Sequence, residues 1–146
     1  MGVFDKSLTG KLAHVLKQLG SEHVMVVHGA DGMDEISFTG DTYVAELNHG
    51  QVTEYVISPR QFGMSLHSAE HIRLHNAEES KAMILAVLEG QTGPARDIVV
   101  LNAGAAIYVA GVAENLQAGI AKAAGAIDDR SASAKLKQLV ELSAQP

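Results

Sequence analysis

The sequence contains no cysteine and no tryptophan, and aromatic residues make up only 4% of it. Without cysteine the chain has no disulfides, no thiolate metal ligands and no cysteine nucleophile, a composition that fits a reducing compartment, so we expect a cytoplasmic protein. The 11 basic residues are scattered and are outnumbered by 17 acidic ones, which gives a net charge of −6. Because nucleic-acid binding requires a basic patch, no nucleic-acid partner is expected.

Long apolar runs and targeting signals are also absent. No stretch is long enough to span a membrane, and the start has no basic region followed by an apolar one, so we expect neither a membrane partner nor a signal peptide. The chain does have 47% apolar residues over 146 positions. That length suits a single sizeable core, and we therefore expect one domain over residues 1–146.

Apolar residues in the first part of the chain predict one helix and one buried strand. Between residues 6 and 19 they recur at helical spacing, with Asp5 placed to cap the start and Gly20 just past the end. The continuous apolar run at 24–27 predicts a strand at 23–28 that is buried on both faces, as in a parallel sheet. Helix and strand together resemble the second half of a βαβ unit.

The middle of the chain predicts a hairpin, and the rest predicts helices. Residues 42–58 hold two β-rich runs around Asn48-His49-Gly50, where asparagine and glycine tolerate the positive φ of a turn. Four helical segments follow, at 77–90, 95–111, 113–127 and 131–143. The second of these contains DIVVL, which alone could be a buried strand, but its apolar residues keep helical spacing. The predicted fold class is α/β, with a mostly parallel sheet, a β-hairpin and C-terminal helices.

The segment HGADGMDEIS, residues 28–37, places three acids in a glycine-containing turn directly after the predicted strand. Asp34 and Glu35 are adjacent, and two negative charges at such a short distance need water or a cation between them. Mg²⁺ is usually held by one or two carboxylates, waters and substrate phosphates, and ligands of open α/β sheets bind at the carboxyl ends of strands. Two interpretations stay open from spacing alone: a magnesium site, or a solvated turn shaped by Asp31 and Gly32.

Histidines offer a competing metal site. His67, His71 and His75 are spaced by four, so on a helix they would share one face, as ligands for zinc or another transition metal do. Residues 63–75 show no clear helical pattern and no fourth ligand, so surface or loop histidines are the alternative. His28, beside the acidic turn, is the one isolated histidine of interest, and a packing role is its alternative.

Other chemical signals are weak. Arg60 in SPRQFGM could meet an anion, although an exposed arginine after a proline needs no such partner. The stretch LNAGAAIYVAG could form a glycine-rich cofactor loop, or its small residues could let helices pack closely. The motifs of phosphate-binding loops, dinucleotide-binding folds, nucleophile elbows and zinc proteases are all absent. A nucleophilic mechanism therefore has no support.

Four segments, taken in order, carry a family resemblance. They read GVFDKSL, LKQLGSEHVMVVHGADGMDEIS, SPRQFGM and NAEESKAMILAVLEGQTGPARDIVVLNAGAAIYVAGVAENLQAGIAKA. Together they cover nearly the whole chain and resemble the C-terminal part of the α/β domain in the anthranilate phosphoribosyltransferase family. The most specific parts are VVHGADGMDEIS, similar to the family's VHG-x-x-G-x-D-E signature, and LNAGAAIYVAG, similar to its N-A-A-A-x-L-Y-x-A-G helix.

The resemblance implies a reaction and a metal. The family transfers the phosphoribosyl group of phosphoribosyl pyrophosphate to anthranilate with Mg²⁺, in tryptophan biosynthesis. Asp34 and Glu35 match its acidic pair, which holds a metal bridging the pyrophosphate, while His28 and Gly29 match the same motif and are assigned to shaping the strand end. The leaving pyrophosphate gathers negative charge that a metal can neutralise, and positioning supplies much of the remaining catalysis. No catalytic residue of this chain is assigned.

The sequence also departs from the family. The family's N-terminal half, with a helical domain, a G-T-G-G-D loop and a K-H-G-N segment, has no counterpart, and SAEHIRLHNAEES stands where the family has G-G-D before N-A. We therefore expect a truncated chain that is inactive alone, needs the missing N-terminal half as its partner, and can associate with itself through an exposed sheet edge. A non-enzymatic remnant or binding module that retains the fold is the alternative function.

Overall fold

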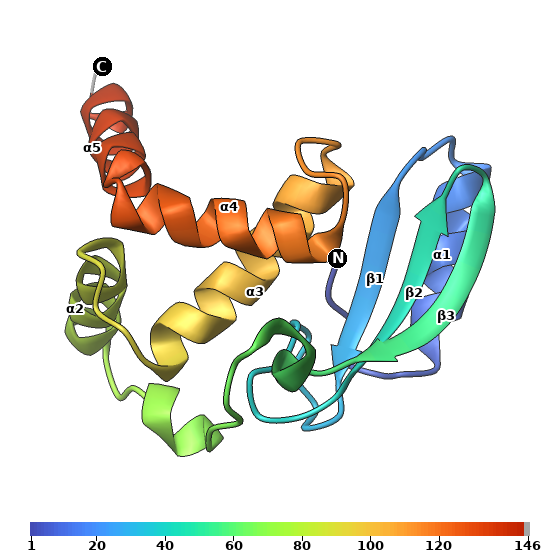
Figure 1. Ribbon diagram of the computed structural model, residues 1–146, viewed down its shortest axis with the longest axis horizontal. Helices are drawn as coiled ribbons and strands as arrows, with labels where there is room; N and C mark the ends of the chain where they lie inside the picture. The colour runs from blue at the N-terminus through green and yellow to red at the C-terminus, as the bar shows by residue number, and fades with distance from the viewer. Residues whose placement is uncertain (145–146) are drawn as a thin grey trace.

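Three strands form one sheet, helix α1 (Leu8–Gln18) covers one face of it, and the helices of the second half of the chain gather beyond the other face (Figure 1). This arrangement is seen in a computed structural model that describes residues 1–144. The sheet and α1 come from the first part of the chain and the large helices from the last part, so the main core forms where the two parts meet.

Helix α1 forms where the apolar spacing predicts it, but its start differs from the prediction. The cap position is Ser7, not Asp5, and the Ser7 side chain makes no capping bond. The Asp5 carboxylate instead accepts the backbone N–H of Ser7 at 2.8 Å, which closes a turn just before the helix. Gly20 follows the helix end with a φ of 88°, as expected for a residue that terminates a helix in the left-handed region.

The strands lie in the order β1 (Val24–Gly29), β2 (Thr42–Asn48) and β3 (Gln51–Ile57), and both neighbouring pairs are antiparallel. The expectation of a mostly parallel sheet is therefore wrong for residues 1–144. Parallel pairing in this part of the chain is limited to one bridge between Gly2 and Val27, at the outer edge of β1. Helix α1 connects the segment at Gly2 to β1, so the predicted βαβ relation is present only at that bridge.

The apolar run in β1 is nevertheless buried on both faces. Val26 packs against α1, whereas Met25 and Val27 belong to the core shared with the later helices. A strand covered by helices on both faces shows the same apolar run whichever way its neighbours point. Burial could therefore be inferred from the sequence, whereas strand direction could not.

Strands β2 and β3 form the predicted hairpin, with Asn48 paired to Gln51. The two loop residues are His49, with a φ of 47°, and Gly50, with a φ of 75°. Positive φ at both loop positions is the type I′ geometry that matches the twist of the flanking strands. The sequence suggested Asn48 for the strained position, but the structure places His49 there.

The rest of the chain is helical at the four predicted places. Two short 3₁₀ helices and four α-helices follow the sheet: η1 (Pro59–Phe62), η2 (Ala69–Ile72), α2 (Ala77–Leu88), α3 (Pro94–Val109), α4 (Leu116–Asp128) and α5 (Ser131–Ser143). The ambiguous DIVVL segment lies inside α3. Among the residues described, none of these helices combines the length and apolar character that crossing a bilayer requires.

Small residues let α3 and α4 pack against each other. A Cβ atom on Gly104 of α3 would lie 2.7 Å from backbone atoms of Ile120, and one on Gly119 of α4 would lie 2.3 Å from the Gly104 carbonyl oxygen. The small residues of LNAGAAIYVAG thus serve helix packing, and the interpretation as a cofactor loop is wrong.

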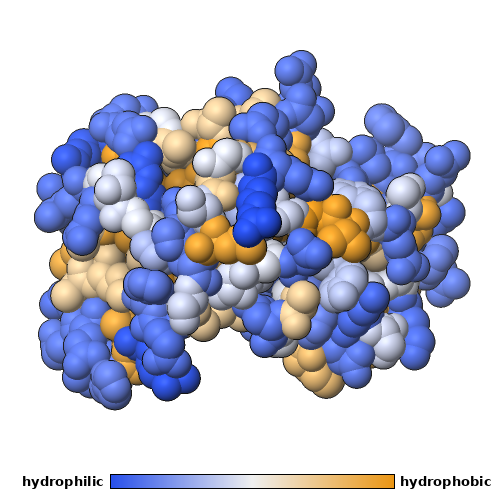
Figure 2. Space-filling view, turned by 60° about the horizontal axis from the view of Figure 1, so that its bottom comes forward, coloured by the Kyte–Doolittle hydropathy of each residue, from blue (hydrophilic) through white to orange (hydrophobic). Residues whose placement is uncertain are grey.

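Hydrophilic side chains cover most of the face in Figure 2, with separate apolar groups between them. The exposed large apolar residues are spread over several elements: Phe4, Leu19, Ile84, Val112, Leu139, Val140 and Leu142 are among them.

The buried core holds Phe38 and Leu101, which come from the loop after β1 and from α3. The loop that carries the acidic turn is therefore anchored in the core by its own later residues.

Candidate functional site

The acidic turn, residues 30–35, directly follows the carboxyl end of β1. Asp34 and Glu35 are both exposed, while Ile36 and the next two residues are buried. The adjacent carboxylates are thus presented to solvent by a segment that enters the core immediately after them. Within residues 1–144 no group of three or more histidine, aspartate or glutamate side chains is arranged to hold a metal, so this pair can supply only part of a metal's ligands.

Asp31 has a different role from its two acidic neighbours. Its carboxylate accepts the hydroxyl of Ser37 at 2.6 Å, the hydroxyl of Thr39, and the backbone N–H of Met33 at 3.1 Å. Burial acts to raise the pKa of Asp31, but these hydrogen bonds outweigh it and hold the pKa below its ordinary value. Asp31 therefore stays ionised and braces the turn.

Glycines let the chain fold back on itself at the strand end. A Cβ atom on Gly29 would lie 2.5 Å from an Asp31 carboxylate oxygen and 3.1 Å from the Ser37 Cβ atom, so a side chain there would displace the brace of the turn. The backbone N–H of Gly29 donates to the Met33 carbonyl at 2.8 Å. On the other side, Gly2 lies so close to the Asp34 carbonyl group that it has no room for a side chain.

His28 bonds to the start of the chain and not to the turn. Its Nδ1–H donates to the Val3 carbonyl at 2.8 Å, and its ring stacks on Tyr43 with ring centres 6.5 Å apart. These contacts fit the packing role that the sequence left open for this histidine. They tie the first residues to the end of β1, next to the acidic turn.

The exit of the turn is held by a side chain from α3. The backbone N–H of Ile36 donates to Asn102 Oδ1 at 2.8 Å, and Asn102 Nδ2 donates back to the Ile36 carbonyl at 3.0 Å. Glu35 also lines a mostly apolar groove of about 530 Å³ between β1 and α3. The acidic turn is therefore braced by its own residues on one side and by a distant helix on the other.

The three histidines of the competing metal site do not come together. They lie in and around η2, a 3₁₀ turn, so the spacing of four does not place them on one helical face. His67 lies 3.4 Å from the Asp97 carboxylate, and His75 lies 3.3 Å from that of Glu79. The rings of His67 and His71 meet edge to face, 5.9 Å apart. Separate surface contacts thus account for these side chains.

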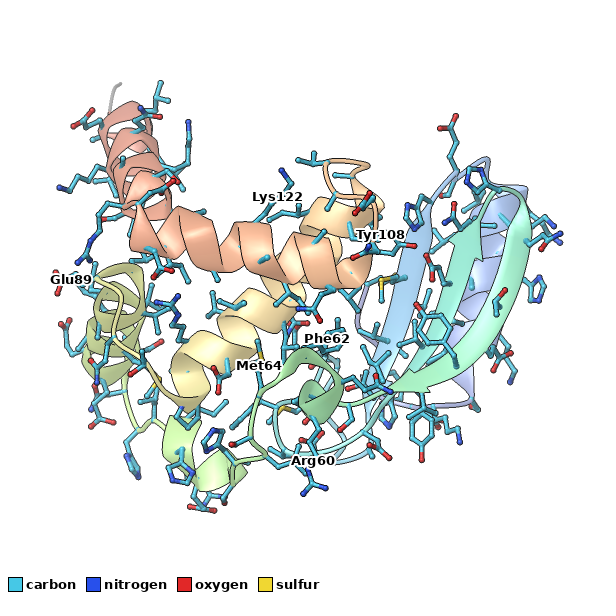
Figure 3. All side chains as sticks on the ribbon, viewed as in Figure 1. Arg60, Phe62, Met64, Glu89, Tyr108 and Lys122 are labelled. Atoms are coloured by element: carbon cyan, nitrogen blue, oxygen red, sulfur yellow. The ribbon has the colours of Figure 1, made fainter. Side chains whose placement is uncertain are left out.

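Arg60 is exposed on η1 and points away from the body of the molecule in Figure 3. Phe62 and Met64, from the same segment, pack against the main core. The apolar residues therefore hold this loop in place, and Arg60 remains in solvent, as its alternative interpretation expects.

Sequence reasoning missed a hydrogen-bonded cluster between the sheet and the end of α3, where Figure 3 shows Tyr108. One carboxylate oxygen of Glu46 is 2.8 Å from His23 Nε2 and accepts the Tyr108 hydroxyl at 2.7 Å, and the other accepts the Tyr55 hydroxyl at 2.6 Å. The signal was present, because Glu46 lies two residues after Val44, on the strand face that carries core residues.

The Glu46 side chain is only 12% exposed, yet it remains a carboxylate. Burial acts to raise the pKa of Glu46, but the hydrogen bonds from Tyr55, Tyr108 and His23 outweigh it and lower the pKa. Burial and the same carboxylate raise the pKa of both tyrosines. The cluster lies away from the acidic turn and joins the sheet to α3, so its arrangement suits a structural role.

Comparison with known proteins places the chain among transferases. Residues 1–133 match the family described as "Glycosyl transferase family, a/b domain". The chain is 63% identical to anthranilate phosphoribosyltransferase of Methylobacillus flagellatus over 143 residues, which are 98% of this chain and 42% of that protein. It is 57% identical to the protein of the same name from Laribacter hongkongensis over 142 residues, covering 97% and 42%.

Solved structures show the same fold. Anthranilate phosphoribosyltransferase from Thermus thermophilus matches with a TM-score of 0.87 and 32% identity, over 96% of this chain and 41% of that one. The Saccharomyces cerevisiae enzyme in complex with PRPP and Mg matches with a TM-score of 0.85 over the same shares, and at 22% identity that match supports the fold alone. The chain thus spans about 42% of the length of the curated relatives it matches.

Proposed function

Because the chain belongs to the glycosyl transferase family through its a/b domain, we propose that it takes part in transferring the phosphoribosyl group of phosphoribosyl pyrophosphate to anthranilate. Relatives up to 63% identical over nearly the whole chain carry the name of that activity. The chain would act as the C-terminal portion of an α/β domain, together with the remaining portion that those relatives possess. Tryptophan biosynthesis is the pathway that this reaction serves.

The observation that carries the proposal is the exposed pair Asp34 and Glu35 at the carboxyl end of β1. Oxygen ligands open to solvent suit Mg²⁺, which keeps several waters and takes further ligands from substrate phosphates. Within residues 1–144 no third histidine, aspartate or glutamate joins the pair in a metal-holding group, which agrees with a metal that takes further ligands from a substrate. The donor set of the turn therefore fits Mg²⁺.

The residues of this chain would bind and orient, and they would not attack the substrate. Mg²⁺ bound at the pair would neutralise the negative charge that the leaving pyrophosphate gathers. Asp34 and Glu35 would hold the diphosphate end of the donor through that ion, while the brace made by Asp31 keeps the turn in shape. A held diphosphate leaves the sugar carbon in one position relative to the amine, and positioning of this kind is a large part of catalysis.

A reconstitution experiment tests the proposal. The chain is mixed with phosphoribosyl pyrophosphate, anthranilate and Mg²⁺, and the loss of anthranilate fluorescence is followed. The assay is repeated after adding a separately expressed N-terminal half of the 63% identical Methylobacillus flagellatus protein. We expect no turnover from either polypeptide alone and measurable turnover from the mixture.

Two outcomes contradict the proposal in different ways. Turnover by the chain alone would show that the missing half is dispensable. A stable complex of the two polypeptides that has no activity would favour the alternative, a binding module that keeps the fold. Gel filtration of the mixture establishes whether the complex has formed before either conclusion is drawn.

A further inference from the structure

We propose that Asn102 is a positioning residue for the acidic pair: through its side-chain amide, α3 fixes the peptide that links Glu35 to Ile36. The inference rests on the proposed role of the pair as a Mg²⁺ site and assigns one more residue to it. It concerns a contact between positions 66 residues apart, which no local motif contains.

The geometry of the contact leaves the Asn102 amide one orientation. Its Oδ1 accepts the Ile36 N–H at 2.8 Å, and its Nδ2 donates to the carbonyls of Ile36 at 3.0 Å and of Ile98 at 2.9 Å. A flipped amide would place a donor against the Ile36 N–H and an acceptor against two carbonyl groups. The bond to the Ile98 carbonyl, four residues earlier in α3, therefore fixes the orientation of the Asn102 side chain independently of its contact with Ile36.

The held group belongs to the same peptide unit as the carbonyl of Glu35. Because a peptide bond is planar, fixing the Ile36 N–H also fixes the direction in which the chain leaves Glu35. Ile36 is only 2% exposed, so these hydrogen bonds do not compete freely with water. Asp31 holds Met33 before the pair and Ser37 after it, and Asn102 holds Ile36 directly after Glu35, so the two acids lie between anchored residues.

The composition of α3 supports a specific purpose for this side chain. From Ile98 to Tyr108, every residue of the helix other than Asn102 is apolar, a glycine or the terminal tyrosine. Asparagine is a poor helix former, because its side chain competes for backbone groups. An apolar residue at position 102 would leave both polar backbone atoms of Ile36 without the partners that Asn102 gives them.

The experiment uses Mn²⁺ with inorganic pyrophosphate as a paramagnetic probe of the ¹⁵N-labelled chain. Mn²⁺ should broaden the amide signals of Asp34 and Glu35 first in a titration. In Asn102→Ala we expect the concentration needed for the same broadening to rise on the order of 10-fold, as for residues that orient metal ligands. Exchange of the Ile36 amide hydrogen with solvent should accelerate in the same variant.

The matched control is Asn115→Ala, which removes the side chain that caps α4 by accepting the Ala118 N–H at 2.8 Å. Both variants delete an asparagine that bonds to backbone, but only Asn102 bonds to Ile36, the residue directly after the acidic turn. The control should lower the melting temperature and leave both the broadening at the turn and the Ile36 exchange rate unchanged. Equal effects in the two variants would mean that Asn102 acts only through overall stability, and the inference would be overturned.

Two further measurements keep the test decisive. If Asn102→Ala does not fold, exchange of the Ile36 amide hydrogen in the unaltered chain is compared with that of buried α3 amides. An unprotected Ile36 amide would contradict the inference. The double variant Asp34→Asn, Glu35→Gln separates the two proposals. If it abolishes the broadening but Asn102→Ala has no effect, the metal site stands and the positioning role fails. If the double variant has no effect, the metal site itself fails.

Discussion

At the scale of single residues, the acids after β1 differ because their neighbours differ. Asp31 is hydrogen-bonded to two hydroxyls and a backbone N–H, whereas Asp34 and Glu35 extend into solvent. A carboxylate already occupied by three donors has little left for a metal, while an exposed one keeps its lone pairs. The three nearby acids therefore differ in their capacity to bind a metal because of their contacts and not because of their spacing.

The exposed pair can be changed with little effect on folding. In the reconstituted enzyme, Asp34→Asn with Glu35→Gln should raise the Mg²⁺ concentration for half-maximal rate and lower turnover by more than about 10-fold, the lower bound seen when groups that merely orient metal ligands are removed. Unfolding free energy should change by less than about 0.5 kcal/mol per exposed site. A Mg²⁺ titration of the initial rate measures the first effect, and urea unfolding measures the second.

The control replaces two other exposed acids, Glu114→Gln with Glu141→Gln, which removes the same charge far from the turn in sequence. It should leave the Mg²⁺ dependence unchanged. Identical kinetics in the turn variant and this control would return the acidic turn to an ordinary solvated loop.

At the scale of secondary structure, the contact between α3 and α4 depends on glycine. Gly104 faces the backbone of Ile120 and Gly119 faces the backbone of Gly104, so the two helices approach until main-chain atoms meet. Such a contact also fixes the rotation of α3 about its own axis. This rotation places Asn102 where it bonds to Ile36 and Tyr108 where it bonds to Glu46 of the sheet. Helix packing is thereby connected to the site.

A Cβ atom at Gly104 would have to move backbone, not a flexible side-chain end. Gly104→Ala should therefore destabilise the chain by about 1–3 kcal/mol through overpacking, despite the better helix propensity of alanine. Gly125→Ala is the matched control in α4, because nothing lies within 4 Å of a Cβ atom there. It should be neutral or stabilising by about 0.5–1 kcal/mol. Urea unfolding monitored by circular dichroism compares them, and a neutral Gly104→Ala would show that the helices can separate without cost.

At the scale of the whole molecule, the sheet part and the helical part are joined by an apolar core and by the cluster around Glu46. Strands β1 to β3 lie on one side in Figure 1 and α2 to α5 on the other, and Tyr108 reaches from α3 to the Glu46 carboxylate at 2.7 Å. The cluster contributes to holding the two parts together only while Glu46 is ionised and accepts three donors.

This arrangement predicts a dependence of stability on acid. The folded-state pKa of Glu46 is lowered from 4.5, so its contribution is fully present above pH 4.5 and is lost as the pH falls below that value toward the folded pKa. Glu46→Gln should lower the unfolding free energy by about 1–3 kcal/mol near neutral pH, since donors in the cluster lose a charged acceptor. As the pH falls below 4.5, the same variant should lose less stability than the unaltered chain.

Urea unfolding at several pH values measures both effects. Glu54→Gln, an exposed glutamate on β3, is the control for the loss of one negative charge. Its stability should follow the pH dependence of the unaltered chain. Parallel pH profiles for Glu46→Gln and the unaltered chain would show that the cluster carries no ionisation-linked stability.

Local patterns in the sequence determined the helices, the hairpin and the acidic pair, because each depends on residues only a few positions apart. Helical spacing located α1 and the four later helices, the Asn48-His49-Gly50 run located the hairpin, and HGADGMDEIS placed the adjacent acids Asp34 and Glu35 directly after a strand. Tertiary structure alone decided the antiparallel order of the sheet, the Glu46 cluster and the hold of Asn102 on Ile36. A buried strand looks the same in sequence whichever way its neighbours run, and a polar side chain in a helix reveals its partner only when a segment 66 residues away folds against it.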